Sequence, residues 1–226
     1  MPRLDKHISA HIGAPRKTVR LMLAQRRIMV DGKVASDMSQ TIDKFSRVQL
    51  DGEWTQNHTA HYLMLNKPQG VVCATKDPLH RTILDLLELP DKEQLHIVGR
   101  LDYNSTGLVL LTNDGQWSRK LSHPDSKLIK RYRVTTEQTI TEEYVQAFQS
   151  GMYFDFEGIT TRPAPLTILD SKTAQVDLTE GRYHQIKRMF GRFQNKVLSI
   201  HRFAVGSYEL GELSPGEYKS IAPDAA

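Results

Sequence analysis

The chain has 226 residues and a formal net charge of +4 at pH 7, and charged residues make up 25% of it. This length suits one large domain, or a small domain followed by a larger one. No apolar run approaches membrane-spanning length, residues 1–5 lack the apolar segment of a signal peptide, and the single Cys73 excludes an internal disulfide. We therefore expect a cytoplasmic protein that does not bind membranes. Metal-ligand spacings, Walker loops and dinucleotide-binding motifs are missing from the sequence, so we expect neither a metal nor a small-molecule cofactor.

The positive charge is unevenly distributed along the sequence. Residues 1–60 contain ten Lys and Arg against six Asp and Glu, whereas residues 61–226 contain twenty of each kind. Two further basic runs, residues 119–133 and 182–202, contain six Lys and Arg each, with one acid in the first and none in the second. A single charge run is usually a solvated helix face. Three runs in one chain favour a polyanionic partner, and we expect nucleic acid.

The first quarter of the chain predicts two short helices and a small sheet. Apolar residues in 4–12 share one helical face, and Gly13 is well placed to end that helix. Pro15 suits the start of a second helix that runs to residue 24. The other elements expected here are a hairpin at residues 28–34, a strand and turn at residues 48–52, and a polar linker at residues 53–61.

The rest of the chain interleaves predicted strands and helices. Because short turns join the strands, we expect an α+β fold with a mixed, mainly antiparallel sheet flanked by helices. We place the domain boundary after residue 57, which gives domains of residues 1–57 and 58–226. The predicted elements are a strand, turn and strand at 62–72, a helix at 82–87, a strand at 108–111, a turn at 113–115, a strand at 128–134, a helix at 141–150 and a strand at 174–178.

The most informative residue is Asp102, which lies with Arg100 in a turn that leads into the apolar run at 108–111. A loop anchored on a buried strand can hold a reactive side chain in a fixed pose. The carboxylate can act as a base, as the partner of a cationic intermediate or as a nucleophile. Glycosidases usually place two carboxylates near one bond, and this motif has no second acid. A lysine close to Asp102 would keep it ionised, and Lys187 is the candidate, with a phosphate contact as its alternative role.

Four motifs together resemble those of the pseudouridine synthases, and they lie at residues 66–70, 99–102, 130–132 and 180–189. Three stretches of the first quarter resemble the S4-like (α-L) RNA-binding module, and they lie at residues 3–6, 16–20 and 27–32. The combination is similar to the branch of the family that modifies the small ribosomal subunit. The resemblance implies an isomerase that converts uridine 516 of 16S rRNA to pseudouridine during ribosome biogenesis, in a central RNA-binding cleft.

Three positions depart from the family pattern. Pro15 stands where many S4 modules have Ser, which removes a hydroxyl contact with RNA. Asn104 and Ser105 stand where relatives often have Asp and Thr, and both keep hydrogen-bonding capacity. Residues 183–185 are closer to the small-subunit enzymes than to relatives that act on the large subunit.

The resemblance also implies roles for individual residues. Asp102 would attack either C1′ of the ribose or C6 of the uracil, and Lys187 would pair with it. Tyr132 would be catalytic as well, stacking on the uracil and helping to remove the C5 proton, although a core aromatic residue of a strand is an equal alternative. Arg100 would occupy the space left by the flipped uridine, or bind its phosphate, since the base must leave its stack to react. The other pocket residues are Ile186 and Leu101, while His184 and Gln185 would orient the helix that carries Lys187.

The remaining expected RNA contacts are basic or polar side chains of both domains. In the catalytic domain, we expect Asn66 and Lys67 to be exposed beside a turn, where they can contact RNA. Arg182 and Arg188 either bind phosphates or pair internally. The complete set of these further RNA contacts is Asn66, Lys67, Lys130, Arg182, Arg188, Arg3, Lys6, Arg16, Lys17 and Arg20.

The expected partner is 16S rRNA or a small-subunit assembly intermediate, bound by a monomer. The closest alternative is a 23S rRNA pseudouridine synthase of the same family. A non-catalytic S4-type RNA-binding protein, in which Asp102 is a turn residue, belongs to a different class. An RNA glycosidase is a third reading, and it would release free uracil.

Overall fold

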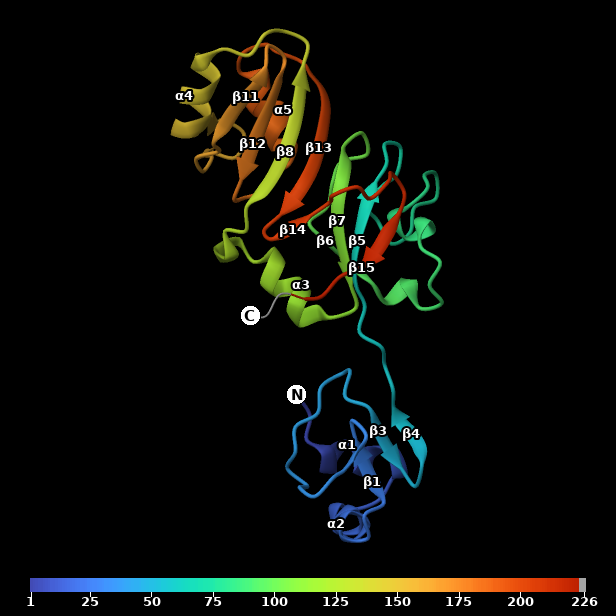
Figure 1. The fold of residues 1–226 in the computed structure, drawn as a ribbon. Coiled ribbons are helices and arrows are strands. Elements are labelled where there is room, and N and C mark those ends of the chain that lie inside the picture. Colours follow the sequence, from blue (N-terminus) through green and yellow to red (C-terminus); the bar gives the residue numbers. More distant parts are fainter. Residues whose placement is uncertain (224–226) are drawn as a thin grey trace. The chain divides into compact units, whose positions relative to one another are not determined.

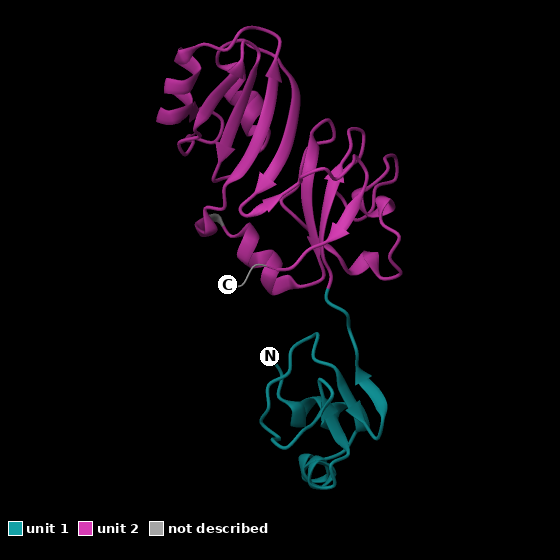
Figure 2. Ribbon diagram, viewed as in Figure 1, with its two compact units in different colours: residues 1–60 teal, residues 61–226 magenta. Residues whose placement is uncertain are grey.

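Residues 1–60 and residues 61–226 form two separate units, which Figure 2 shows in different colours. The computed structural model describes residues 1–223, except for the side chain of Pro124. Each unit has hydrophobic core residues of its own, so each buries apolar surface without help from the other.

In the first unit, helices α1 (Leu4–Ile12) and α2 (Arg16–Ala24) precede an antiparallel sheet of order β2-β1-β3-β4. Gly13 ends α1 with a φ of 64°, a conformation that glycine adopts without steric cost. The predicted helices and hairpin are confirmed, but the linker prediction is wrong at its start because residues 53–56 form a strand. The strands are β1 (Ile28–Val30), β2 (Lys33–Val34), β3 (Val48–Leu50) and β4 (Glu53–Gln56).

The second unit is built on one mixed sheet of order β11-β12-β8-β13-β7-β5-β15, with β14 paired to β13 and β6 paired to β7 (Figure 1). Among the strand pairs of the described residues, β7 with β13 is parallel and the others are antiparallel, so the predicted mixed, mainly antiparallel sheet is confirmed. Strands β9 (Tyr153–Phe154) and β10 (Ile159–Thr160) pair separately. The strands of the large sheet are β5 (Tyr62–Lys67), β6 (His96–Val98), β7 (Thr106–Thr112), β8 (Lys130–Thr136), β11 (Leu166–Asp170), β12 (Thr173–Leu178), β13 (Val197–Val205), β14 (Tyr208–Glu209) and β15 (Tyr218–Ser220).

Strand β7 is buried on both of its faces. Val109 and Leu111 belong to the larger core cluster, whereas Leu108 and Leu110 belong to a second cluster with Trp117. A strand covered on both faces needs apolar residues at successive positions, which explains the continuous apolar run. The loop before this strand is therefore anchored to a strand that is buried on both faces.

Three α-helices and three short 3₁₀ helices complete the described part of the second unit. Helix α4 lies against β11 and helix α5 against β13 (Figure 1). In the described residues, no helix combines the length and the apolar character needed to cross a membrane. The helices are α3 (Gly115–Ser122), α4 (Glu142–Ser150), α5 (Gln185–Gly191), η1 (Ile83–Leu86), η2 (Lys92–Gln94) and η3 (Pro124–Ser126).

Three local predictions differ from the structure. The turn predicted at 113–115 is instead the start of α3, because the Asp114 side chain accepts hydrogen bonds from the backbone N–H groups of Gln116 and Trp117. The helix predicted at 82–87 is a single 3₁₀ turn. The second strand predicted near residue 72 is absent from the described chain, where Val72 forms only an isolated bridge.

Candidate active site

The loop of Asp102 connects β6 to β7 and is fixed at both ends by one buried arginine. Arg202 of β13 is only 1% exposed. Its guanidinium donates hydrogen bonds to the carbonyl of Gly99, before the loop, and to the carbonyl of Leu108, after it. This role of Arg202 cannot be predicted from the sequence, because a basic run gives no sign of which arginine is buried. Arg202 limits the positions that the loop can adopt.

Lys67 holds the same loop from the other side. Its side chain is fully buried, and its Nζ donates to the carbonyls of Pro68, Tyr103 and Ser105 at 3.0, 3.2 and 2.7 Å. Burial lowers the pKa of this lysine. The prediction that Asn66 and Lys67 are exposed is wrong, since Asn66 is 5% exposed and donates to the carbonyl of Leu213. Both lie in β5 between β7 and β15, so they support the site from within the fold.

Helix α5 brings two basic side chains to the Asp102 carboxylate. Lys187 Nζ lies 3.4 Å from Asp102 Oδ2, and His184 Nε2 lies 3.5 Å from the same oxygen. All three side chains are about one third exposed, at 34%, 35% and 36% for Asp102, Lys187 and His184. The carboxylate is thus accessible to solvent and faces positive charge from a segment 85 residues further along the chain.

Asp102 lines a cavity of about 110 Å³. Its apolar walls come from the Asp102 loop, from three strands and from α5, and they are Leu101, Tyr132, Leu178, Ile186 and Ile200. Its polar walls are Arg100, Ser105, Arg182, His184 and Gln185. A half-apolar, half-polar recess suits a planar ring with hydrogen-bonding edges. The predicted pocket residues Leu101 and Ile186 both line it, although each is also buried in the core.

Tyr132 lies on β8 and is 7% exposed, so it is at once a core residue and a wall of the cavity. The Arg202 guanidinium carbon is 5.9 Å from its ring centroid, which is compatible with a cation–π contact. Arg100 is exposed at the rim, and it has no ion pair within residues 1–223. The structure therefore brings Asp102, Lys187, Tyr132 and Arg100 to one place.

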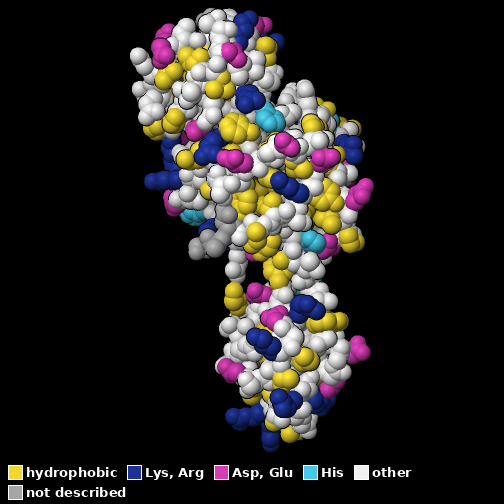
Figure 3. Space-filling model, in the orientation of Figure 1, with side chains coloured by type: hydrophobic (Ala, Val, Ile, Leu, Met, Phe, Trp, Pro, Cys, Tyr) yellow, Lys and Arg dark blue, Asp and Glu magenta, His cyan; other side chains and the backbone are white. Residues whose placement is uncertain are grey.

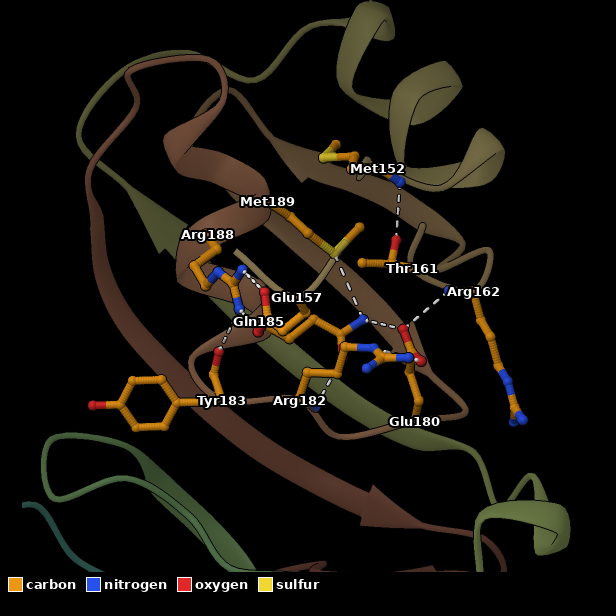
Figure 4. A network of polar contacts seen from close by, with 10 residues as sticks. All are labelled: Met152, Glu157, Thr161, Arg162, Glu180, Arg182, Tyr183, Gln185, Arg188 and Met189. Atoms are coloured by element: carbon orange, nitrogen blue, oxygen red, sulfur yellow. Dashed lines mark hydrogen bonds and ion pairs between the residues drawn. The ribbon is translucent and has the colours of Figure 1, made fainter. Parts of the chain in front are cut away.

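A polar network fixes the turn that precedes α5 (Figure 4). Glu180 Oε1 accepts hydrogen bonds from the Arg162 N–H and from Gln185 Nε2, while its Oε2 accepts one from Arg182 Nε. The Arg182 N–H donates to Gln185 Oε1 at 3.1 Å. Gln185 is 3% exposed, so it orients the helix from inside, as predicted for this residue. Glu180 was missed as a site residue, although an isolated acid next to a basic run was a usable signal.

Arg188 is engaged within the protein. Its guanidinium donates two hydrogen bonds to Glu157, at 2.6 and 2.5 Å (Figure 4). It also lies 3.7 Å from the centroid of the Phe154 ring. The hydrogen bond to Glu157 raises the pKa of Arg188 and lowers that of the acid. Of its two predicted roles, the internal pairing is the one observed. Arg182 pairs with Glu180 but still lines the cavity.

The predicted RNA contacts of the first unit lie on or next to α1 and α2. Arg3 pairs with the buried Asp5 at 3.0 Å, and Arg16 lies 3.6 Å from the same carboxylate, yet both arginines remain about half exposed. Figure 3 shows Lys and Arg side chains over the α2 end of this unit. The other predicted RNA contacts of this unit are also exposed, and they are Lys6, Lys17 and Arg20. In residues 1–223, no three His, Cys, Asp or Glu side chains are placed to hold a metal ion.

A mixed sheet that presents one carboxylate to a cationic, half-apolar cavity is the arrangement expected of a pseudouridine synthase. The model of the RNA pseudouridylate synthase family matches residues 61–191. The ribosomal small subunit pseudouridine synthase A of Pseudomonas aeruginosa is 46% identical to the chain, covering 97% of it and 96% of the relative. The enzyme of the same name from Yersinia pestis is 39% identical, covering 98% and 95%.

A solved structure described as a pseudouridylate synthase is 38% identical, with a TM-score of 0.70 over 98% of this chain and 96% of that one. The chain belongs to the RNA pseudouridylate synthase family. The predictions of a pseudouridine synthase fold and of an enzyme of this class are confirmed.

Proposed function

We propose that this enzyme isomerises one uridine of 16S rRNA to pseudouridine, at position 516, during maturation of the small ribosomal subunit in the cytoplasm. The relatives named for small-subunit modification align over almost the whole chain, which supports this substrate over 23S rRNA. The observation that carries the chemistry is the 3.4 Å separation of Asp102 Oδ2 and Lys187 Nζ at a cavity wall.

In the proposed reaction Asp102 is the nucleophile. Its carboxylate forms a transient bond to C1′ of the ribose or to C6 of the uracil, and the N1–C1′ bond breaks. The base then turns, C5 joins C1′, and the bond to Asp102 breaks. One proton leaves C5 and one is gained at N1, so the product is an isomer of the substrate and nothing is consumed.

The surrounding residues give this sequence its physical basis. Lys187 places a positive charge next to the carboxylate and favours its ionised, nucleophilic form. Tyr132 provides an aromatic surface for the base inside the cavity. The uridine must leave its stack to reach Asp102, and the exposed Arg100 at the rim is positioned to fill the space or bind a phosphate.

The first unit is proposed to be an S4-like RNA-binding module of a monomeric enzyme. Five of its exposed cations lie on or next to α1 and α2, and residues 1–60 hold the excess of Lys and Arg over Asp and Glu. Phosphate contacts of this kind supply affinity without reading sequence. The catalytic unit would then act on RNA that the first unit has helped to bind.

The direct test is to incubate the purified protein with 16S rRNA, with 23S rRNA and with small-subunit assembly particles. Pseudouridines are mapped by carbodiimide-dependent stops of reverse transcription, and free uracil is measured in the supernatant. We expect one new stop, at position 516 of 16S rRNA, and no uracil. A stop confined to 23S rRNA would overturn the substrate, released uracil would identify a glycosidase, and binding without any stop would identify a non-catalytic RNA-binding protein.

A further inference from the structure

A second cavity, of about 310 Å³, adjoins the proposed uridine pocket. The two cavities share Arg100, Tyr132 and Gly181 as lining residues, so Tyr132 separates two neighbouring recesses. The second recess is also lined by Lys130 and Arg202. The sequence predicts that Lys130 contacts RNA, but neither that prediction nor the isomerisation assigns a group of the RNA to this space.

The second cavity carries unbalanced positive charge. Lys130 is half-buried at the start of β8, and its Nζ donates to the carbonyl of Leu128 at 3.3 Å. Burial and the nearby charge of Arg202 lower the pKa of Lys130. Glu180 is the acid that counteracts this effect, but its oxygens already accept hydrogen bonds from Arg162, Arg182 and Gln185. A half-buried ammonium next to other cations is stabilised when an anion enters.

A third cavity that adjoins the uridine pocket lacks this excess of positive charge. A cavity of about 170 Å³ shares Ser105 and Ile200 with the uridine pocket and is lined by Gln69 and Asn104. Lys187 also lines this smaller cavity, but its charge faces Asp102. An RNA strand that crosses the uridine pocket thus meets unpaired positive charge in the Lys130 cavity and neutral amide side chains in the smaller cavity.

We propose that the Lys130 cavity binds the phosphodiester group that joins the target uridine to one neighbouring nucleotide of the RNA. This inference rests on the proposed function, because it takes the first cavity as the uridine pocket. Lys130 and the exposed Arg100 donate to the phosphate oxygens, whereas Arg202 keeps its hydrogen bonds to the Gly99 and Leu108 carbonyls. Binding this phosphate holds the backbone while the base lies on the other side of Tyr132.

The test compares the full-length protein with Lys130→Gln, Lys130→Arg and a control, Lys172→Gln. Lys172 is exposed in the turn between β11 and β12, and the register of β12 with β8 places it at the far end of the sheet from Lys130. Binding and single-turnover pseudouridine formation are measured on a 16S rRNA fragment that contains the target uridine, at several salt concentrations. The same fragment is also made with one neutral methylphosphonate linkage, placed either 5′ or 3′ of that uridine.

We expect Lys130→Gln to weaken binding of the unmodified fragment about tenfold. The salt slope of log K should fall in magnitude by about 0.7, the value of one lost single-strand phosphate contact. Lys130→Arg should recover most of the affinity, and Lys172→Gln should match the wild type. At one of the two positions, the methylphosphonate should weaken binding to the wild type by a similar factor. The same linkage should hardly weaken binding to Lys130→Gln. A purely structural role of Lys130 cannot produce this difference between the two proteins.

The proposal is overturned if both methylphosphonates weaken binding to the wild type and to Lys130→Gln equally, or if Lys130→Gln behaves like Lys172→Gln. Thermal unfolding of each variant separates a lost contact from a lost fold. If Lys130→Gln does not fold, a wild type that binds both methylphosphonate fragments as tightly as the unmodified one still overturns the proposal. A wild-type enzyme that makes no pseudouridine in any fragment would instead contradict the proposed function.

Discussion

The ion pair of Asp102 and Lys187 is too exposed to contribute much to the stability of the fold. Both side chains are about one third exposed and the shortest N–O distance is 3.4 Å, so the pair contributes no more than about 1 kcal/mol to folding. The same positive charge next to a nucleophile can lower the activation free energy of a reaction by far more, because it lies where charge changes in the transition state. The geometry therefore favours a chemical role for Lys187 over a structural one.

Replacing Lys187 tests that distinction. We expect Lys187→Gln to lower the single-turnover rate of pseudouridine formation on the order of 10²-fold, while the free energy of unfolding in urea changes by less than about 1 kcal/mol. Lys187→Arg should retain more activity, because it keeps the positive charge near Asp102. An unchanged rate in Lys187→Gln would remove Lys187 from the mechanism, and a large loss of stability would make its role structural.

At the scale of single residues, the sequence predicted which chemistry to look for better than which side chains are exposed. Asp102 and Lys187 could be paired from motifs that lie far apart in the chain. Lys67 is equally suited by its sequence to bind RNA, and only the structure shows that its ammonium donates to two carbonyls of the Asp102 loop and to that of Pro68. Whether a cation is buried depends on strands that pair across long sequence separations. The local sequence pattern does not indicate which strands pair in this way.

At the scale of elements, the site depends on how closely β7 approaches β13. These strands run parallel, with Gly107 opposite Arg202. A Cβ atom on Gly107 would lie 2.1 Å from the carbonyl oxygen of Arg202, and Gly107 has a φ of 108°. Both facts require glycine here, and Arg202 is the residue that fixes the Asp102 loop.

We therefore expect Gly107→Ala to destabilise the protein by at least about 3 kcal/mol, measured by urea unfolding. The matched control is Gly191→Ala at the end of α5, where nothing lies within 4 Å of the added Cβ and φ is ordinary. The control should be neutral or stabilising by up to about 1 kcal/mol, because alanine favours helix more than glycine does. Equal stability of the two variants would mean that β7 and β13 can separate without cost.

The same strand pair makes stability depend on pH. His201 of β13 lies with its Nδ1 2.9 Å from the Thr106 hydroxyl, and burial together with the charge of Arg133 lowers its pKa from the usual 6.5. Well above pH 6.5 the histidine is neutral in both states, and its titration does not affect the free energy of unfolding. As the pH falls below 6.5, the unfolded chain binds a proton that the folded protein resists, so stability decreases.

His201→Gln removes this proton-linked loss. Between pH 7.5 and 5.5, we expect the wild type to lose more unfolding free energy in urea than the variant does. Parallel curves for the two proteins would show that His201 is not a source of the pH dependence. The comparison uses the change with pH in each protein, so a constant stability difference between them does not affect the result.

Helices and strands were predictable where the sequence pattern is local. They were less predictable where a capping side chain or a neighbouring element determines the structure. Strand β7 and helix α4 follow from an apolar run and from a helical stretch ended by Ser150 and Gly151. At the start of α3 the sequence Asn-Asp-Gly, which is typical of turns, predicts a turn. The structure has a helix there, because the side chain of Asp114 acts as a helix cap. The cavities join residues from 98 to 205, so their shapes could not be predicted.

At the scale of the whole molecule, the two units differ in charge. Residues 1–60 carry an excess of four Lys and Arg, and residues 61–226 have equal numbers of acidic and basic side chains. Because each unit has its own core, residues 61–226 are expected to fold alone. This charge asymmetry was readable from the sequence, whereas the position of the last strand of the first unit required the structure.

A fragment of residues 61–226 should bind 16S rRNA more weakly than the full chain. The slope of log K against log salt should also fall in magnitude by at least about 1, since each lost phosphate contact removes about 0.7 to 0.9. Filter binding at several salt concentrations measures both quantities. A fragment with the affinity and salt slope of the full chain would show that the first unit does not supply phosphate contacts.

The central claim is that the Asp102 carboxylate reacts with the uridine. Its most direct test is Asp102→Asn, with pseudouridine formation at saturating enzyme and the Kd for 16S rRNA measured on the same preparation. We predict that the rate falls at least about 10³-fold while the Kd and the unfolding midpoint stay close to those of the wild type. An Asp102→Asn protein that still forms pseudouridine at a comparable rate would contradict the account.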